Sequence, residues 1–330
     1  MEKLMRYLIF TVSWLVSSTA LAVDTAPALN IDKNRITVSG ISSGAAMAHQ
    51  IHVAYSDVFS GAGILSGVPY NCADNSLITA LKRCTENKEA PLPVEEFAQQ
   101  VRDGSKTGLL ADPANLADDR VYLFHGTLDN KVSSLVHDAT ASLYTRFIPA
   151  EQILEVNDIA AGHVFPAMDG ENNCTDLIPP FVGDCDYDGA GELLSHLYAG
   201  LKQPDGNVGT QLLEVPLAGA GDADLMETAY LLVPPACSKD DQSCALHLVL
   251  HGCAQSAESV GTDFILQSGY LPWAETNDIV LAFPQVKKSL VSPMNPHGCW
   301  DWWGYTGDEY STRAGKQMTT VVNWINSLSR

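Results

Sequence analysis

The segment 35–55 constrains the fold more than any other part of this sequence. Residues 36–39 predict a short buried strand, Gly40-Ile41-Ser42-Ser43-Gly44 is a G-x-S-x-G pentapeptide, and the small residues at 45–55 predict a helix. A chain that passes directly from a strand through a strained serine into a helix needs glycines on both sides, because the backbones approach closely. The pentapeptide alone often marks only a loop, so the flanking strand and helix carry the prediction that Ser42 is a nucleophile.

The rest of the chain continues the alternation of strands and helices. Strands are predicted at 58–66, 121–124, 152–156, 228–233, 246–250 and 278–283, and helices at 134–147, 190–201 and 312–328. Residues 71–118 interrupt the alternation with a cysteine-bracketed loop and a helical stretch at 94–103, and we expect them to form an excursion over the sheet. The pattern predicts an α/β fold with a mostly parallel central sheet flanked by helices.

The N-terminus has the features of a secretory leader. Lys3 and Arg6 precede an apolar run at 7–16, and Ala20-Leu21-Ala22 is an A-x-A cleavage pattern. We therefore assign 1–22 as a signal peptide and 23–330 as a single catalytic domain, with no linker and no separate substrate-binding domain. No later run reaches the roughly 18 apolar residues of a membrane span. The mature chain is expected to be secreted, either extracellular or periplasmic, and not to bind a membrane.

Cysteine usage agrees with export. The sequence has eight cysteines, all after residue 22 and none in a C-x-x-C pair, so we expect four disulfides. Buried free thiols are the alternative. Eight cysteines allow 105 connectivities, and the pairing of neighbours in sequence is a guess that rests on the compact loops it closes. The guessed pairs are Cys72–Cys84, Cys174–Cys185, Cys237–Cys244 and Cys253–Cys299.

Charge and composition exclude several kinds of partner. A formal net charge of −20 repels nucleic acid and keeps an exported protein in solution. Asp184, Asp186 and Asp188 resemble the start of a calcium loop, but Ser195 stands where a bidentate glutamate is needed. An Asx-rich turn is the preferred interpretation. We therefore expect no metal and no cofactor, and a monomeric protein.

An acid and a base each follow the end of a predicted strand. Asp129 comes shortly after the strand at 121–124, and His163 comes after the strand at 152–156. The order serine, aspartate, histidine is that of the α/β-hydrolases, and reacting groups collect at the carboxyl ends of parallel strands. The sequence therefore predicts a triad in which Ser42 attacks, His163 is the base and Asp129 orients it.

Alternatives remain for two members of this triad. Asp129 precedes an asparagine, and Asp-Asn pairs favour simple turns. His163 competes with eight other histidines, of which His297 in a Pro-Gly loop is the serious rival. The others suit core, surface or loop-shaping roles: His49 and His52 on the first helix, His137, His196, His247, and His125 and His251 before glycines.

The predicted oxyanion hole has an unusual order. One donor is the amide after the nucleophile, Ser43, and in an ordinary α/β-hydrolase the second comes from a His-Gly loop that precedes the nucleophile in the chain. Here the matching strand and His-Gly, at 246–252, lie far downstream of Ser42. A circular permutation of the α/β-hydrolase fold resolves the order, because chain ends that lie close together tolerate it. Cys253 then supplies the second amide, and a Cys253–Cys299 disulfide holds that loop.

An aromatic run follows the last cysteine. Cys299-Trp300-Asp301-Trp302-Trp303-Gly304-Tyr305 places three tryptophans and a tyrosine in a polar, glycine-flanked segment. Core packing is the commoner fate of such residues. Because the expected disulfide ties the run to the oxyanion loop, we expect at least one of the aromatic rings to face the cleft.

Five motifs in one order resemble the single-domain, circularly permuted poly(3-hydroxybutyrate) depolymerases. They are G-I-S-S-G, H-G-T-L-D, A-G-H-V-F-P, L-H-L-V-L-H-G-C and C-W-D-W-W-G-Y, and the resemblance runs from about residue 34 to the final helix. It implies a secreted serine esterase whose partner is a polyester or oligoester. By motif it assigns Ser42, Asp129 and His163 as catalytic, Ser43 and Cys253 as oxyanion donors, and Trp302 or Trp303 as a contact to the polymer.

Two other functions remain open at this stage. One is an esterase for other aliphatic or aromatic polyesters, for plant cell-wall esters or for small carboxylic esters. Ordinary cell-wall esterases keep the His-Gly loop before the nucleophile, so the order of motifs counts against that version. The other is a catalytically silent binding protein that keeps the fold, and the complete set of serine, aspartate and histidine counts against it.

Overall fold

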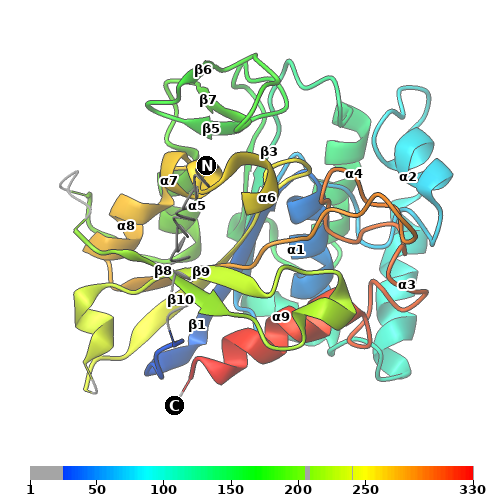
Figure 1. The fold of residues 1–330 in the computed structure, drawn as a ribbon. Helices are drawn as coiled ribbons and strands as arrows, with labels where there is room; N and C mark the ends of the chain where they lie inside the picture. The colour runs from blue at the N-terminus through cyan, green and yellow to red at the C-terminus, as the bar shows by residue number, and fades with distance from the viewer. Residues whose placement is uncertain (1–24, 205–208, 240, 330) are drawn as a thin grey trace, which may run out of the picture.

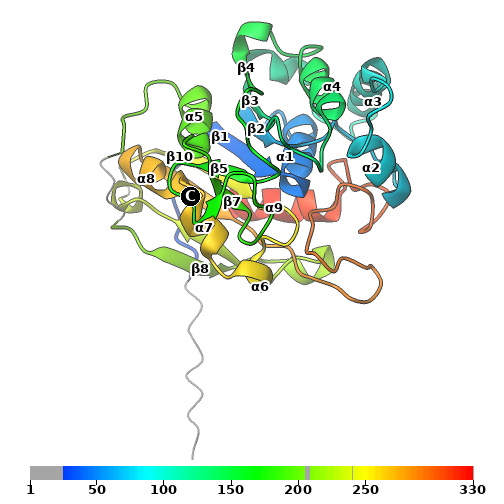
Figure 2. The same ribbon diagram turned by 90° about the horizontal axis from the view of Figure 1, so that it is seen from above.

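The computed structural model describes residues 25–204, 209–239 and 241–329, so the signal peptide predicted at 1–22 lies outside them. Within these ranges the centre of the molecule is an eight-stranded sheet in the order β4-β3-β2-β1-β10-β11-β9-β8 (Figures 1 and 2). The strands are β1 (Ile31–Ile41), β2 (Gly61–Leu65), β3 (Arg120–Phe124), β4 (Ile153–Val156), β8 (Leu212–Pro216), β9 (Thr228–Leu232), β10 (Cys244–Leu250) and β11 (Ile279–Phe283). From β4 to β11 all neighbours pair in parallel, while β9 is antiparallel to β11 and to β8. The predicted mostly parallel sheet is confirmed.

Helices cover both faces of the sheet, because the interior strands are apolar on both sides. On β3, Val121 and Leu123 pack into the core under one helix layer, and Tyr122 and Phe124 pack into the core under the other. Figure 2 shows the two layers on either side of the sheet. The first layer contains α1 (Ser43–Ala54), α3 (Val94–Lys106), α4 (Ser134–Tyr144) and α9 (Lys316–Ser327), and the second contains α5 (Gly189–Leu197), α7 (Asp263–Gln267) and α8 (Tyr270–Thr276).

The excursion at 71–118 does not lie over the sheet as expected. Its longer helix, α3, packs against α4, so the excursion extends the helix layer beside α1 (Figure 2). It also contains α2 (Leu77–Cys84) and a short 3-10 helix, η1 (Pro113–Asp118). Further short helices along the chain are η2 (Ala150–Gln152), η3 (Ala220–Ala223), η4 (Pro235–Ser238) and α6 (Ala257–Val260). None of the helices in the described ranges is long and apolar enough to cross a membrane.

A second, small sheet lies beyond the carboxyl ends of the main strands (Figure 1). It consists of β5 (Phe165–Ala167), β7 (Val182–Asp184) and β6 (Asn172–Asn173), with β7 in the middle. The sequence interpretation did not include it, because strands of two or three residues carry no periodic signal. Its loops stand directly above the edge where the predicted reacting groups collect.

Disulfides join the same four pairs that the sequence interpretation proposed. They are Cys72–Cys84, Cys174–Cys185, Cys237–Cys244 and Cys253–Cys299, and no free cysteine remains in the described part of the chain. The alternative of buried free thiols is therefore wrong for this structure. The first three bridges close short loops, whereas Cys253–Cys299 spans 46 residues and joins two loops at the carboxyl edge of the sheet.

The two ends of the described chain meet at the opposite edge of the sheet. The backbone N–H of Leu29, just before β1, donates to the carbonyl of Leu328 at the end of α9 over 2.7 Å. Strand β1 nevertheless lies in the interior of the sheet, between β2 and β10. The first strand of the chain is thus a central strand.

Candidate active site

Ser42 occupies a strained turn between β1 and α1. Its φ of 57° and ψ of −121° lie outside the regions that a side chain prefers. The turn is fixed on both sides, because the Ser42 N–H donates to the Leu65 carbonyl (3.0 Å) and the Ser42 carbonyl accepts from the Ala46 N–H (2.9 Å). Such strain persists only where the surroundings impose it, and it is common at functional sites. The strand, turn and helix expected around Ser42 are all present.

The two glycines of the pentapeptide are required by contact with backbone. A Cβ atom on Gly40 would lie 2.3 Å from the carbonyl carbon of Gly44, and one on Gly44 would lie 2.2 Å from the carbonyl oxygen of Leu250. Neither neighbour is a flexible side chain, so neither can move aside. The pentapeptide therefore allows the elbow to pack between β1 and β10, which places Ser42 beside the loop that follows β10.

His163 and Asp129 form a buried hydrogen-bonded pair. His163 Nδ1 donates to Asp129 Oδ2 over 2.8 Å, and the Asp129 side chain is fully buried. Asp129 Oδ1 accepts from the backbone N–H groups of Lys131 (2.8 Å) and Val132 (3.0 Å). The carboxylate thus shapes its own turn and also orients the imidazole, leaving Nε2 free to act as a base. The two interpretations of Asp129, turn and triad member, are compatible.

The pair meets because two strand-end loops lie side by side. The Leu128 N–H donates to the Ala161 carbonyl over 3.0 Å. A Cβ atom on Gly126 would lie 2.1 Å from that same carbonyl oxygen, so the close approach requires glycine at this position. The His-Gly motif at 125–126 therefore brings the segment after β3 against the segment after β4, with Asp129 on one and His163 on the other.

The pKa of Asp129 predicts how the pair responds to acid. Burial alone would raise the pKa of this carboxyl, but the hydrogen bond and charge of His163 and the Lys131 amide outweigh it and hold the pKa at about 2, against an ordinary 3.8. A lowered pKa contributes stability that is fully present above the unfolded value and is lost as the pH falls through the folded one. We expect Asp129→Asn to lower the free energy of unfolding by about 2 kcal/mol near neutral pH. The difference should shrink as the pH falls from 3.8 to about 2.

Urea unfolding of both proteins across this pH range measures the effect. Other carboxylates titrate in the same range in both proteins, so the difference between the two curves isolates Asp129. A difference that stays constant from neutral to acid pH would show that the charge of Asp129 is not stabilised by the fold.

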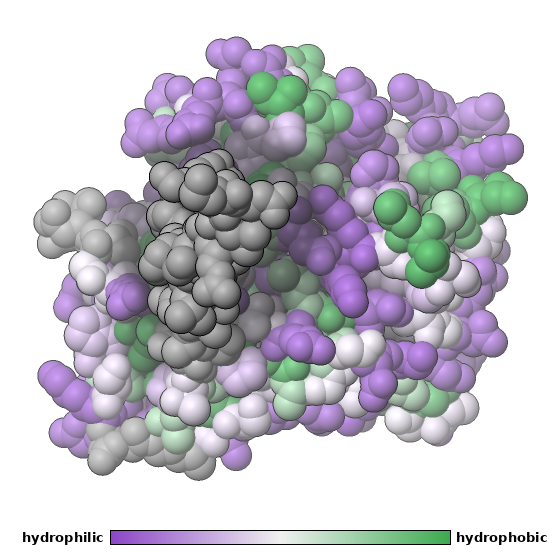
Figure 3. Space-filling model, in the orientation of Figure 1, coloured by the Kyte–Doolittle hydropathy of each residue, from purple (hydrophilic) through white to green (hydrophobic). Residues whose placement is uncertain are grey.

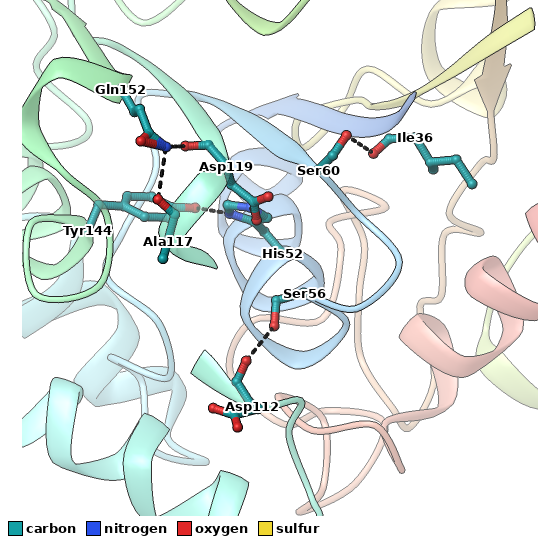
Figure 4. A network of polar contacts seen from close by, with 9 residues as sticks. All are labelled: Ile36, His52, Ser56, Ser60, Asp112, Ala117, Asp119, Tyr144 and Gln152. Atoms are coloured by element: carbon teal, nitrogen blue, oxygen red, sulfur yellow. Dashed lines mark hydrogen bonds and ion pairs between the residues drawn. The ribbon is translucent and has the colours of Figure 1, made fainter. Parts of the chain in front are cut away.

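Seven of the other histidines have structural partners among the described residues. On α1, His52 Nε2 donates to Asp119 Oδ2 over 3.0 Å, and the hydroxyl of Tyr144 is hydrogen-bonded to His52 Nδ1 over 3.2 Å (Figure 4). Gln152 donates to the Asp119 carbonyl from the neighbouring segment (Figure 4). His49 is buried against the Tyr144 ring, and burial lowers its pKa to about 3. These contacts fasten the elbow helix to α4 and to the segment before β3.

The loop after β10 lies against Ser42. A Cβ atom on Gly252 would lie 3.4 Å from Ser42 Cβ, so the backbone passes directly beside the serine. His251 shapes this loop, because Nδ1 donates to the Gly252 carbonyl (2.8 Å) and Nε2 accepts from the Val286 N–H (3.1 Å). Burial lowers the pKa of His251 to about 4, consistent with this neutral form. Cys253 follows at once and is held by its bridge to Cys299.

A crevice of about 500 Å³ joins these parts. Ser42, His163, Gly252 and Cys253 line it, together with residues that the sequence interpretation missed. Those residues include Leu81, Val132, Leu177, Phe181 and Gln255. Gln255 follows Cys253 by two residues and Val132 follows Asp129 by three, whereas Leu81 on α2, Leu177 and Phe181 reach the crevice from segments remote from the predicted site residues. His297 also lines the crevice, but it is not among the ion pairs of the described residues. Of the two histidines that line the crevice, His163 is therefore the one paired with a carboxylate.

The structure does not bring the two predicted tryptophans to this crevice. Neither Trp302 nor Trp303 is among the residues that line it. Trp302 is buried in the main core at 8% exposure, and Trp303 packs edge-on against it and remains partly exposed. Instead, the aromatic run packs beside the residue after Ser42, where the Trp300 N–H donates to Ser43 Oγ over 3.3 Å.

The acidic run near 184–188 is an ordinary helix start. Asp188 Oδ1 accepts from the Gly191 N–H over 2.8 Å, and Asp188 Oδ2 accepts from Trp273 Nε1 over 2.8 Å. Both oxygens of the carboxylate thus serve the N-terminus of α5 and its contact with α8. The Asx-rich turn preferred from the sequence describes this segment.

Three features lie together at the carboxyl edge of a parallel sheet: a strained serine at a strand–helix turn, a buried His–Asp pair and a loop of backbone amides. They define the class of α/β proteins that hydrolyse carboxylic esters through a serine. Comparisons with known proteins identify the family within that class. The chain is 33% identical over 333 residues to the polyhydroxybutyrate depolymerase of Talaromyces funiculosus, covering 96% of each. The chain belongs to the polyhydroxybutyrate depolymerase family. No protein-family model matches it.

Further relatives agree with this assignment. The chain is 38% identical over 322 residues to the poly(3-hydroxybutyrate) depolymerase of Delftia acidovorans, and spans 95% of its own length but 63% of that protein's. The solved structure of PHB depolymerase from Penicillium funiculosum superposes with a TM-score of 0.87 at 32% identity, over 93% of this chain and 100% of that one. A serine-to-alanine variant of PHB depolymerase complexed with an R3HB trimer superposes with a TM-score of 0.86 at 32% identity, over 92% and 98% of the two chains.

Proposed function

We propose that the protein is a serine esterase that hydrolyses poly(3-hydroxybutyrate) or related short-chain polyhydroxyalkanoates to oligomers and monomers. The observation that carries the proposal is that Ser42, His163 and the Gly252–Cys253 loop line one crevice, with Asp129 buried behind His163. Relatives named as depolymerases of this polymer, one of them complexed with a trimer of its monomer, give the substrate class.

The proposed mechanism uses only groups of the chain and water. Ser42 Oγ attacks the ester carbonyl carbon while His163 Nε2 takes its proton, and Asp129 stabilises the imidazolium that forms. The N–H groups of Ser43 and Cys253 donate to the oxyanion. Collapse of the tetrahedral intermediate breaks the ester bond, and His163 returns the proton to the departing alkoxide. Water then attacks the acyl-Ser42 with the same base, which releases the acid and restores the serine.

Apolar side chains on the surface support a polymeric substrate. On α2, Leu81 lines the crevice and Ile78 is 69% exposed. The loop near residue 290 adds Leu290 at 82% exposure, with Val291 beside it. Figure 3 shows apolar side chains gathered where α2 and this loop lie in Figure 1, beside a hollow lined by polar residues. Large apolar patches on a soluble surface mark sites of interaction, and a solid aliphatic polyester offers a matching surface.

We expect the double variant Ile78→Ser with Leu290→Ser to adsorb more weakly to a poly(3-hydroxybutyrate) film. Each exposed side chain that leaves water on adsorption contributes about 1 to 2 kcal/mol, so the partition coefficient should fall by at least tenfold. Depletion of protein from solution over the film measures this. Leu266→Ser on α7, 54% exposed in the opposite helix layer, is the matched control and should adsorb like wild type. Equal adsorption by all three proteins would contradict a role for this patch.

Of the two tryptophans in the resemblance, we propose Trp303 as the one that contacts substrate, outside the crevice. Trp303→Ala should slow hydrolysis of a hydroxybutyrate oligomer more than that of a short ester, with little loss of stability. Trp302→Ala should instead cost about 3 to 5 kcal/mol in the free energy of unfolding, because it empties a core position. Thermal unfolding and parallel assays on both esters separate the two effects. The reverse pattern would assign the contact to Trp302.

The order of motifs supports a circularly permuted α/β-hydrolase fold. Strand β10 and its His-Gly loop lie beside β1, although an ordinary α/β-hydrolase places that loop before the nucleophile in the chain. The hydrogen bond between Leu29 and Leu328 joins the positions that such a rearrangement would connect. We further propose that 1–22 is a cleaved signal peptide and 23–330 a single catalytic domain. The disulfides favour a secreted, extracellular or periplasmic protein. We also propose that it acts as a monomer.

Clearing of a poly(3-hydroxybutyrate) suspension tests the proposed function. Wild type should lower the turbidity and release hydroxybutyrate oligomers, and Ser42→Ala should do neither. A soluble short-chain ester is assayed in parallel. Hydrolysis of that ester without clearing would favour the alternative of an esterase for other polyesters or small esters. Inactivity on both substrates would contradict the proposed ester hydrolysis.

A further inference from the structure

Gln255 connects the oxyanion loop to the opposite wall of the crevice. Its side chain is 3% exposed, and it lines the crevice with Ser42 and His163. Oε1 accepts from the Gly252 N–H over 2.6 Å. Nε2 donates to the carbonyl of Pro180 over 2.9 Å and to that of Phe181 over 3.3 Å. One buried amide group therefore joins two segments that lie far apart in the chain.

The chemistry of these contacts requires a neutral amide in one orientation. A primary amide offers one acceptor oxygen and two N–H donors, and here the acceptor faces an N–H while both donors face carbonyls. Rotating the amide by 180° would set N–H against N–H and oxygen against two oxygens. An unpaired polar group costs far more in a buried site than in water. No other ordinary side chain of this length supplies an acceptor and two donors.

The contact with Gly252 bears on which amide can stabilise an oxyanion. Gly252 lies beside Ser42, and its N–H is already used by Gln255. The next amide, that of Cys253, has no hydrogen bond among those of the described residues. Ala254 then takes a left-handed φ of 60°, and its N–H donates to the His297 carbonyl over 2.6 Å. The turn at 252–255 is therefore held on both sides of Cys253, with the Cys253 amide left available.

The contact with the 180–181 segment fixes the facing wall. Phe181 takes a left-handed φ of 58°, unfavourable for an aromatic residue, and lines the crevice. Its carbonyl accepts from the Phe165 N–H of the small sheet (2.8 Å) as well as from Gln255. The Gln255 side chain thus ties the small sheet above the site to the loop beside the nucleophile.

We propose that Gln255 is the positioning residue of the oxyanion hole. Its acceptor oxygen holds the Gly252 amide away from the substrate, so that the Cys253 amide faces the developing oxyanion. Its two donors hold the segment with Phe181, which lines the opposite side of the crevice, at a fixed position relative to the loop at 252–255. This inference rests on the proposed ester hydrolysis at Ser42. It predicts that the residue acts on the transition state more than on substrate binding, because it orients a donor used there.

Two variants test the proposal with a soluble short-chain ester. Gln255→Met keeps the length but loses every polar contact, and we expect kcat to fall about 10- to 100-fold while KM changes less than about threefold. Gln255→Glu keeps an acceptor for the Gly252 N–H but sets a negative oxygen against the Pro180 and Phe181 carbonyls. Protonation of that glutamate restores a donor, and the nearby carbonyl oxygens raise its pKa. The activity of Gln255→Glu relative to wild type should therefore rise as the pH falls, whereas the relative activity of Gln255→Met should stay flat.

The relative pH profile separates positioning from a general structural effect. Dividing by wild type at each pH removes every pH effect that the two enzymes share. Gln285→Glu is the matched control: Gln285 is also buried, accepts from the Ala257 N–H and donates to the Phe283 carbonyl, but does not line the crevice. It should lower the melting temperature without a pH-dependent recovery of kcat.

Each outcome decides the matter. If both Gln255 variants keep kcat within about twofold of wild type, or if the relative profile of Gln255→Glu is flat, the proposal is wrong. If Gln255→Met does not fold, the profile of Gln255→Glu decides alone. Inactive wild type on the soluble ester would instead overturn the proposed function, so the two failures are distinguishable.

Discussion

Ser42→Ala is expected to lower kcat/KM on a soluble ester by about 10⁵- to 10⁶-fold, since removal of the nucleophile of a serine hydrolase costs about that much. The fold should not suffer. Alanine meets the same backbone strain at φ 57°, and no hydrogen bond of the Ser42 side chain is present among the described residues. We expect a melting temperature within a few degrees of wild type. Steady-state kinetics and thermal unfolding of the same preparation measure both quantities.

Ser60→Ala is the matched control. Ser60 lies just before β2, at the opposite edge of the sheet, and its Oγ donates to the Ile36 carbonyl over 3.2 Å (Figure 4). The same substitution there should leave kcat/KM within about twofold, because the contact touches nothing in the crevice. If Ser42→Ala kept a tenth or more of wild-type activity, the nucleophile would have to be sought elsewhere.

Asp129→Asn is expected to lower kcat by about 10⁴-fold, with KM little changed. The carboxylate accepts from His163 Nδ1 and from two backbone N–H groups. An asparagine can keep the backbone contacts with its oxygen, and then its NH₂ group faces Nδ1. That arrangement favours the tautomer with the proton on Nε2, which can no longer accept the proton of Ser42. The loss should appear in kcat across the pH range in which wild type is active.

Asp112→Asn provides the comparison for this change. Asp112 makes the same kind of turn contact, with Oδ1 accepting from the Ala114 N–H over 2.9 Å at the start of η1, and it lies away from the crevice. Its activity should match wild type. Equal losses in the two variants would mean that a turn, and not the orientation of His163, accounts for the effect of Asp129.

The sequence was sufficient wherever local chemistry determines structure. The elbow was predictable because only glycine tolerates the contacts at Gly40 and Gly44. The central strands were predictable because strands buried on both faces are continuously apolar, as β11 is. That Asp129 and His163 lie together was predictable because each follows a strand end, and parallel strand ends share one edge.

What the sequence could not give depends on contacts between distant segments. The edge strand β8 was missed because Leu-Leu-Glu-Val-Pro is short and half-buried, and pairing with β9 rather than local preference makes it a strand. The segment 257–276, which carries α6, α7 and α8, reads as irregular because no single helix is long enough for a periodic signal.

The tryptophan prediction illustrates the same limit. The run 299–305 has the composition of a binding surface, but Asp301 holds the backbone of its last three residues and of Thr306. The Asp301 carboxylate accepts from the N–H groups of Trp303, Gly304, Tyr305 and Thr306 and is itself buried. Burial raises the pKa of Asp301, although these hydrogen bonds oppose the shift. Trp302, next to this buried acid, lies in the core at 8% exposure, and no pattern in the sequence indicates that.

Because Leu29 and Leu328 are hydrogen-bonded to each other, both ends of the domain lie at one place, and that place determines how a fused second domain could act together with this one. Both positions lie at the amino end of β1, whereas Ser42 follows its carboxyl end, so the 11 residues of that strand separate them. At about 3.3 Å per residue the separation is on the order of 30 Å. A polymer-binding domain fused to either terminus would lie at the edge of the sheet opposite the crevice. The linker would therefore have to reach around the molecule before the fused domain and the crevice could contact the same polymer surface. Short rigid fusions should therefore hold the crevice off the polymer, and long flexible ones should not.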